Sequence, residues 1–187
     1  PVLDDFERSQ VWDCPNVDEL LAECQYRVFA TDMLASGLEA KERADMLVKY
    51  VDALLELYPS CKAVVFGPSH KFLSRESIEN HSDKAVTRFI YYAVNVRYFS
   101  IQGTKDMMVD SLGMSTLFLP DVQYHFHGMN PDEVVNHAYS VLYYIFEHDN
   151  PIGDGETIAG LENGDMSPDI QWKVQYEDSL IQPVREV

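Results

Sequence analysis

Two stretches of the chain place apolar residues at the spacing of an amphipathic helix. Between Glu39 and Tyr58, apolar residues recur at three- and four-residue steps, and charged residues fall largely on the other side. Such spacing lays the apolar side chains along one stripe that faces a core. Residues 131–147 repeat the pattern after Asn130, which is followed by Pro, Asp and Glu as in a capped helix start. We therefore predict helices from Glu39 to Tyr58 and from Pro131 to Glu147.

Runs of β-favouring residues predict the strands. They centre near Tyr26, Ala63, Phe89, Leu112, Val122 and Trp172. The run from Tyr26 to Leu34 is mostly uncharged, as a strand buried on both faces would be. With the following helix and the run from Cys61 to Gly67, it predicts a strand–helix–strand unit with a right-handed parallel crossover. The run from Phe89 to Ile101 is predicted to be the longest strand.

These elements predict one α+β domain over residues 1–187. Its mixed, mainly antiparallel sheet would carry both amphipathic helices on one face, which resembles a ferredoxin-like arrangement. We expect residues 1–15 to be irregular and residues 110–157 to form the central strand, corner, strand, helix and turn. At 187 residues and 46% apolar composition, the chain is long enough for one sizeable core.

Charge narrows the classes of partner. The formal charge is −17, from 31 acidic and 14 basic residues. Such a chain repels polyphosphate backbones and anionic membrane surfaces, so we expect neither nucleic-acid nor membrane binding. The acidity favours solubility, or recognition of a basic protein. Three cysteines without CxxC spacing fit a reducing compartment, and no apolar run is long enough to span a membrane, so we expect a cytoplasmic protein.

A pair of histidines carries the sharpest chemical hypothesis. In the segment from Val122 to His127, residues alternate so that His125 and His127 share one strand face. With Asp121 they could hold a divalent metal such as zinc, and Asp110 is a further candidate ligand or base. The alternative is a solvated polar strand face without any metal. His137, on the second predicted helix, is expected to lie at the surface.

The chain resembles a known family in several motifs. They are DSLGMSTLFLPDVQYHF, the Asn-Pro-Asp-Glu helix start, GDGETI and WKVQYEDSLIQPVREV. Together they are similar to a bacterial family of uncharacterised proteins, catalogued as domain of unknown function four-two-six-one. The similarity runs from about Trp12 to the end and is most specific from Asp110 to Thr157. It implies a soluble bacterial α+β domain and carries over no activity, ligand or catalytic residue.

The expected function is non-catalytic binding. The sequence contains no Ser-His-Asp order, phosphate loop or dinucleotide fingerprint, so we assign no catalytic residue and expect no cofactor. The leading hypothesis is an acidic interaction protein for a basic partner. The alternative is a metal-assisted hydrolase that uses His125 and His127. A small-molecule binding module with a pocket between sheet and helix stays open, as does the oligomeric state.

Overall fold

The computed structural model describes residues 3–32, 37–82, 85–185 and 187, and the chain divides into two compact units, residues 1–95 and 96–187. Helices and strands occur in both units, so the predicted α+β class is confirmed. The strands pair in separate antiparallel sheets instead of the single mixed sheet that we predicted. The assignment of the whole chain to one domain stays a prediction.

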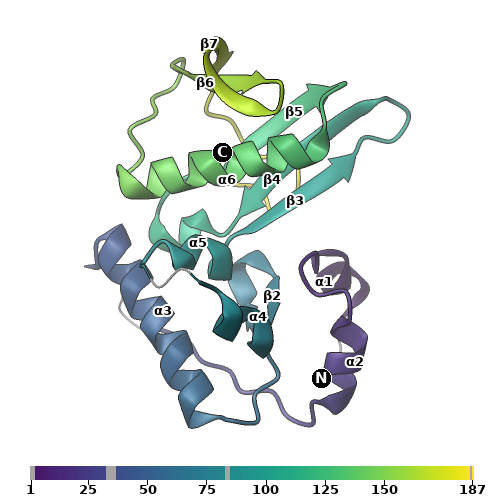
Figure 1. Ribbon diagram of the computed structural model, residues 1–187, viewed down its shortest axis with the longest axis vertical. Helices are drawn as coiled ribbons and strands as arrows, with labels where there is room; N and C mark the ends of the chain where they lie inside the picture. Colours follow the sequence, from purple (N-terminus) through teal and green to yellow (C-terminus); the bar gives the residue numbers. More distant parts are fainter. Residues whose placement is uncertain (1–2, 33–36, 83–84, 186) are drawn as a thin grey trace. The chain divides into compact units, whose positions relative to one another are not determined.

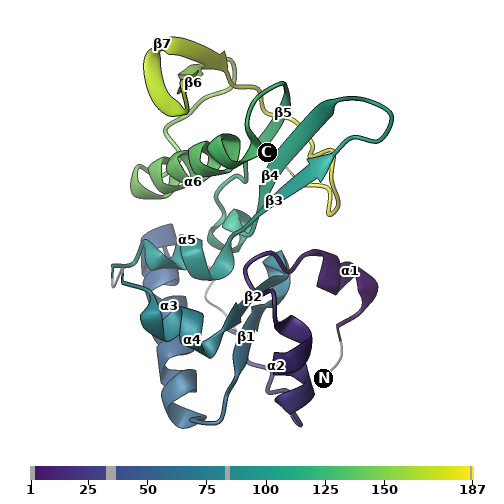
Figure 2. The same ribbon diagram turned by 45° about the vertical axis from the view of Figure 1, so that its right-hand side comes forward.

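The N-terminal unit is built mainly from helices around one hairpin (Figures 1 and 2). Its helices are α1 (Asp5–Ser9), α2 (Val17–Glu23), α3 (Ala40–Leu57), α4 (Arg75–Asn80) and α5 (Arg88–Ala93). Strand β1 (Ala63–Phe66) pairs antiparallel with β2 (Lys71–Ser74) across the short 3-10 helix η2 (Gly67–Ser69). Helix α3 confirms the first predicted helix and packs against α5.

Three predictions for the first part of this unit are wrong. Helix α1 lies inside the segment predicted to be irregular, and the side chains of Asp4 and Glu7 cap it reciprocally. The segment from Tyr26, predicted to be a buried strand, is irregular and exposed over its described residues. Tyr26 is 86% and Phe29 is 84% exposed. Residues 33 and 34 of the prediction lie outside the described residues. Strand β1 therefore pairs with β2, the next strand along the chain, in an antiparallel hairpin. The predicted parallel crossover is absent from the described residues.

The first half of the predicted longest strand is a helix. Residues 88–93 form α5, and the extended part begins only at Asn95. Buried Phe89, Ile90 and Ala93 fit one helical stripe as well as they fit a strand buried on both faces. A short apolar run cannot separate these two structures, so packing against α3 decided between them.

The C-terminal unit places one long helix on a three-stranded sheet (Figure 1). Its sheet has the order β3 (Asn95–Ser100), β4 (Asp106–Leu112), β5 (Gln123–His127), and the 3-10 helix η3 (Met114–Leu117) follows β4. Helix α6 (Pro131–Glu147) confirms the second predicted helix and packs against β4. The two long helices therefore do not cover one sheet face together, because α3 packs on α5 and α6 packs on β4.

A second hairpin completes this unit. Strand β6 (Thr157–Glu162) pairs antiparallel with β7 (Asp165–Lys173). Asn163 and Gly164 form the turn with φ of 52° and 90°. An Asn-Gly pair between β-favouring runs is a strong hairpin signal, and here it marks a hairpin that we did not predict.

Across the described residues, no helix combines the length and the apolar composition needed to cross a membrane.

Candidate functional site

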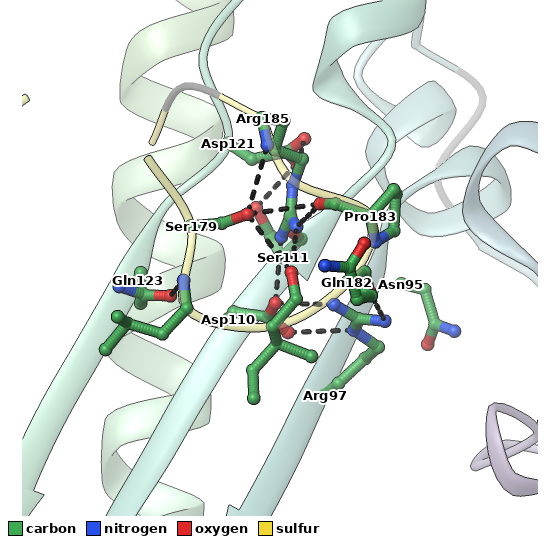
Figure 3. A network of polar contacts seen from close by, with 12 residues as sticks. Asn95, Arg97, Asp110, Ser111, Asp121, Gln123, Ser179, Gln182, Pro183 and Arg185 are labelled. Atoms are coloured by element: carbon green, nitrogen blue, oxygen red, sulfur yellow. Dashed lines mark hydrogen bonds and ion pairs between the residues drawn. The ribbon is translucent and has the colours of Figure 1, made fainter. Parts of the chain in front are cut away.

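A network of buried charges holds one face of the β3–β5 sheet (Figure 3). The antiparallel register pairs Asp106 with His127, Met108 with His125, and Asp110 with Gln123. Residues that pair across neighbouring strands project from the same face. Apart from buried Met108, one face of β4 and β5 thus carries polar side chains, which are buried at Asp110 and exposed at His125 and His127.

Arg97 and Asp110 form the innermost pair, and both side chains are 0% exposed. Arg97 Nε donates to Asp110 Oδ1 at 2.8 Å and Arg97 Nη2 donates to Asp110 Oδ2 at 2.5 Å. This two-bond geometry matches a planar guanidinium to a carboxylate. Arg97 Nη1 also donates to the carbonyl oxygen of Gln182 at 3.3 Å. The pair therefore also holds a segment far along the chain.

Arg185 supplies the second buried cation. Its Nη2 donates to Asp110 Oδ2 at 2.8 Å and also to the carbonyl oxygen of Ser111, and its Nε donates to Asp121 Oδ2 at 3.2 Å. The side chain of Arg185 is 10% exposed. Two arginines and two aspartates thus form a compact cluster in which each charge meets an opposite one. Such compensation is what makes buried ions tolerable.

Asp121 is surrounded by donors. Its Oδ1 accepts from the Ser111 hydroxyl at 2.8 Å and from the Met114 amide at 3.2 Å, and its Oδ2 accepts from the Gly113 amide at 3.4 Å. Gly113 reaches this position with φ of 139°, a value that favours glycine. Burial raises the pKa of Asp121, while Arg185 and these donors oppose the rise. The carboxylate fixes the turn between β4 and β5.

The network attaches the C-terminal segment, residues 177–187, to the sheet. Ser179 Oγ accepts from the amide of Arg185 at 3.1 Å, and Glu177 and Val187 exchange two backbone hydrogen bonds. Gln123 Oε1 accepts from the Leu180 amide at 2.8 Å. Figure 3 shows this segment crossing the polar side chains of the sheet. The cluster therefore stabilises the attachment of this segment to the sheet, because its arginines and aspartates form ion pairs with one another.

The predicted metal-ligand set is not brought together. Asp121 is buried in the network, whereas the side chains of His125 and His127 are 53% and 62% exposed. The exposure confirms the predicted phase of the strand. Their acidic neighbour is Asp106, whose Oδ1 lies 3.0 Å from His127 Nδ1 and whose Oδ2 lies 3.7 Å from His125 Nε2. Asp110, the other candidate, is paired with both arginines.

Within the described ranges, no group of three or more His, Cys, Asp and Glu side chains is arranged to hold a metal ion.

His137 lies in the interior, contrary to its predicted surface position. It is 1% exposed, its Nε2 donates to the carbonyl oxygen of Ala159 at 2.7 Å, and its Nδ1 accepts from the Tyr124 hydroxyl at 3.1 Å. Trp172 lies against it with ring centroids 4.7 Å apart. Burial lowers the pKa of His137, and the hydrogen bond to Ala159 partly opposes this. A neutral imidazole thus joins α6, β5 and β6.

A cavity of about 280 Å³ adjoins these aromatic rings. It lies beside the start of β5, below α6 and along residues 172–177. The small-molecule binding module with a pocket between sheet and helix stays a prediction.

Sequence reasoning missed Arg97, Arg185 and the interior position of His137. Arg97 stands in a β-favouring run, where a charged residue in phase with Asn95 indicates a second, polar face. His137 lies three positions after Val134 and four before Val141, within the apolar stripe of its helix. The phase of Arg97 and the helical spacing of His137 could therefore have indicated these two positions from the sequence. Arg185 stands in a segment without periodicity, and no pattern marked it.

The comparison with protein families agrees with the resemblance seen in the sequence. Residues 110–187 match the family described as Domain of unknown function (DUF4261). No curated protein and no solved structure matches the chain. The matched residues include Asp110, Ser111, Asp121 and Arg185, and the predicted family is confirmed over this part of the chain. Residues 110–187 therefore carry the sequence of this domain of unknown function, and the buried charge network lies largely within it.

Proposed function

We propose that the protein is a non-catalytic binding protein whose acidic C-terminal unit binds a basic protein partner. One observation supports the proposal most: both arginines of this unit are buried against Asp110 and Asp121. The two aspartates therefore neutralise the positive charges of both arginines inside the unit. Acidic residues therefore outnumber basic ones on the surface of the unit.

The C-terminal unit contains many more acidic than basic residues. Residues 96–187 contain fifteen Asp and Glu and four Lys and Arg, a formal charge of −11 out of the chain's −17. With Arg97 and Arg185 buried, Lys105 and Lys173 are the remaining Lys and Arg of the unit, and both are exposed. A field of one sign over a small unit attracts oppositely charged proteins and speeds their association.

The β6–β7 hairpin presents part of this charge on a regular element. Asp165 begins β7 and Asp169 lies within it, and both are exposed. A hairpin fixes the spacing of its side chains more firmly than an irregular loop does. We therefore place the recognition of the basic partner on this hairpin.

The test compares two variants of equal charge. D165K/D169K changes the hairpin, and E19K/E56K changes two exposed acids of the N-terminal unit by the same amount. Binding of a synthetic lysine–glycine repeat peptide would be measured by calorimetry at low and at physiological salt. We expect the hairpin variant to lose about tenfold in affinity and the control much less, because close charges act more strongly than distant screened ones. Equal losses, or no binding by the unmodified protein at low salt, would refute the proposal.

The metal-assisted hydrolase stays a prediction beside this proposal. The observation in its favour is that His125 and His127 share a strand face with Asp106 as a neighbouring carboxylate. Titration of the untagged protein with zinc tests whether His125 and His127 bind a metal. One tightly bound zinc that is lost in His125→Ala supports the hydrolase, and zinc binding that is unchanged by this substitution excludes the site.

A further inference from the structure

Apolar, aromatic and polar side chains together line the cavity of the C-terminal unit. Its volume of about 280 Å³ is enough for a small organic molecule. The main wall residues come from β5, α6, β6, β7 and the segment after β7. They are Tyr124, Val141, Ile145, Ile158, Trp172 and Tyr176.

The hydroxyl groups of the two wall tyrosines already have partners. The Tyr124 hydroxyl is bonded to His137, and the Tyr176 hydroxyl donates to the carbonyl oxygen of Ile152 and accepts from Asn150 Nδ2 at 3.1 Å. Tyr124 and Trp172 meet edge to face with ring centroids 6.1 Å apart. The interior of the cavity therefore offers ring and aliphatic surface, which suits the apolar body of a ligand.

Two carboxylates line the cavity: Asp121 is buried and paired with Arg185, whereas Glu177 is exposed. The Oε1 of Glu177 accepts from Gln123 Nε2 at 3.0 Å. Gln123 is itself fixed, because its Oε1 accepts from the Leu180 amide. Lys173 is the one Lys or Arg of the lining, and it also lies exposed on the rim. The formal charge of −11 on the surrounding unit favours a cation over an anion at this opening.

We propose that this cavity is a binding site for a small aromatic or branched aliphatic amine. The apolar body lies against the rings of Tyr124 and Trp172, and the ammonium group pairs with the Glu177 carboxylate at the rim. Aromatic walls and a nearby carboxylate both favour a cationic group over its neutral and anionic analogues. Ile158 and Trp172 of the β6–β7 hairpin line this site, whereas the proposed recognition of a basic protein uses Asp165 and Asp169 of the same hairpin, which do not line the cavity.

Three probes of the same body and different charge test the site. They are phenethylamine, 2-phenylethanol and 3-phenylpropionate, each added up to about 10 mM. Binding is read from the fluorescence of Trp172 in a Trp12→Phe background, because the chain has two tryptophans and Trp12 lies in the N-terminal unit. We expect the amine to bind most tightly, then the alcohol, then the acid. Equal affinities, tighter binding of the acid, or no change with any probe would overturn the proposal.

Two neighbouring acids provide matched variants. Glu177→Gln should weaken the amine about fivefold and leave the alcohol unchanged, as expected for an exposed ion pair. Asp178→Asn removes an equal charge from an exposed residue outside the lining and should leave both affinities unchanged. Ile158→Phe fills the cavity and should abolish binding of all probes while circular dichroism stays native. If the two acid variants weaken amine binding equally, the preference for a cation comes from the net negative charge of the unit. That result would overturn the role of Glu177.

Discussion

Polar side chains in the interior set the chemistry of the C-terminal unit at the scale of single residues. Arg97 and Asp110 are fully buried, and His137 is 1% exposed. Each has partners that satisfy its charge or its hydrogen bonds, as buried polar groups require. Among these groups, His137 can gain a proton as the pH falls.

His137 should make the stability of the C-terminal unit depend on pH. Its folded-state pKa is lowered by burial, so the unfolded chain takes up a proton more readily. The stabilising contribution is complete above about pH 6.5 and declines as pH falls through the lowered folded pKa, by at most about 1.4 kcal/mol per pH unit. His137→Gln, which can keep both hydrogen bonds, should flatten this slope. Urea unfolding at several pH values measures it.

The control for this slope is His125→Gln, which removes an exposed histidine of the same unit. It should reproduce the slope of the unmodified protein. If both substitutions flatten the slope equally, burial of His137 is not its cause.

At the scale of elements, hydrogen bonds and ion pairs attach the described residues of one segment without a helix or strand to the sheet. Residues 177–187 are joined to β4 through Arg185 and to β5 through Gln123. Glu177 and Val187 also close the segment on itself by backbone hydrogen bonds. Arg185 is therefore the main attachment of this segment to the sheet, because it contacts both buried aspartates.

Arg185→Met should release the segment. The substitution keeps most of the side-chain volume and leaves Asp121 without its cation, which costs about 3–5 kcal/mol for a buried pair. Hydrogen exchange should show faster exchange at the amides of Glu177, Ser179 and Val187, together with a lower free energy of unfolding. Lys105→Met, which removes an exposed cation of the same unit, should change the free energy by less than about 0.5 kcal/mol. A similar small change for Arg185→Met would contradict the anchoring role.

The uneven distribution of charge is the main property at the scale of the whole molecule. The N-terminal unit has a formal charge of −6 and the C-terminal unit −11. Like charges on a compact surface repel one another, and salt screens them more than it screens the buried arginine–aspartate pairs. The stability of the C-terminal unit should therefore rise with ionic strength.

Thermal unfolding measures this rise. Between about 10 mM and 200 mM salt the Debye length falls from about 30 Å to below 10 Å, so surface repulsion weakens while the buried pairs persist. In the Trp12→Phe protein, the fluorescence transition of Trp172 should move to higher temperature, by about 4–8 °C for each kcal/mol gained. D165K/D169K should reduce the shift. A transition that moves down with salt would show that exposed ion pairs outweigh the repulsion.

The sequence alone determined the elements that local interactions specify. Helices α3 and α6 follow from apolar spacing, and the start of α6 follows from Asn130, whose side chain accepts from the Asp132 amide. The exposed phase of His125 and His127 follows from the two-residue period of a strand. These features need only neighbours within a few positions. Helix α6 and the two histidines lie within residues 110–187, which match the family.

Only the tertiary structure decided which distant residues meet. Asp110 and Arg185 are 75 positions apart, and their contact depends on where the last segment crosses the sheet. The segment at Tyr26 has strand composition but no place in a sheet among the described residues, because β1 pairs with its neighbour in the hairpin. Strand pairing and burial depend on the partner available in three dimensions. For that reason the charge network and the cavity could not be read from local patterns.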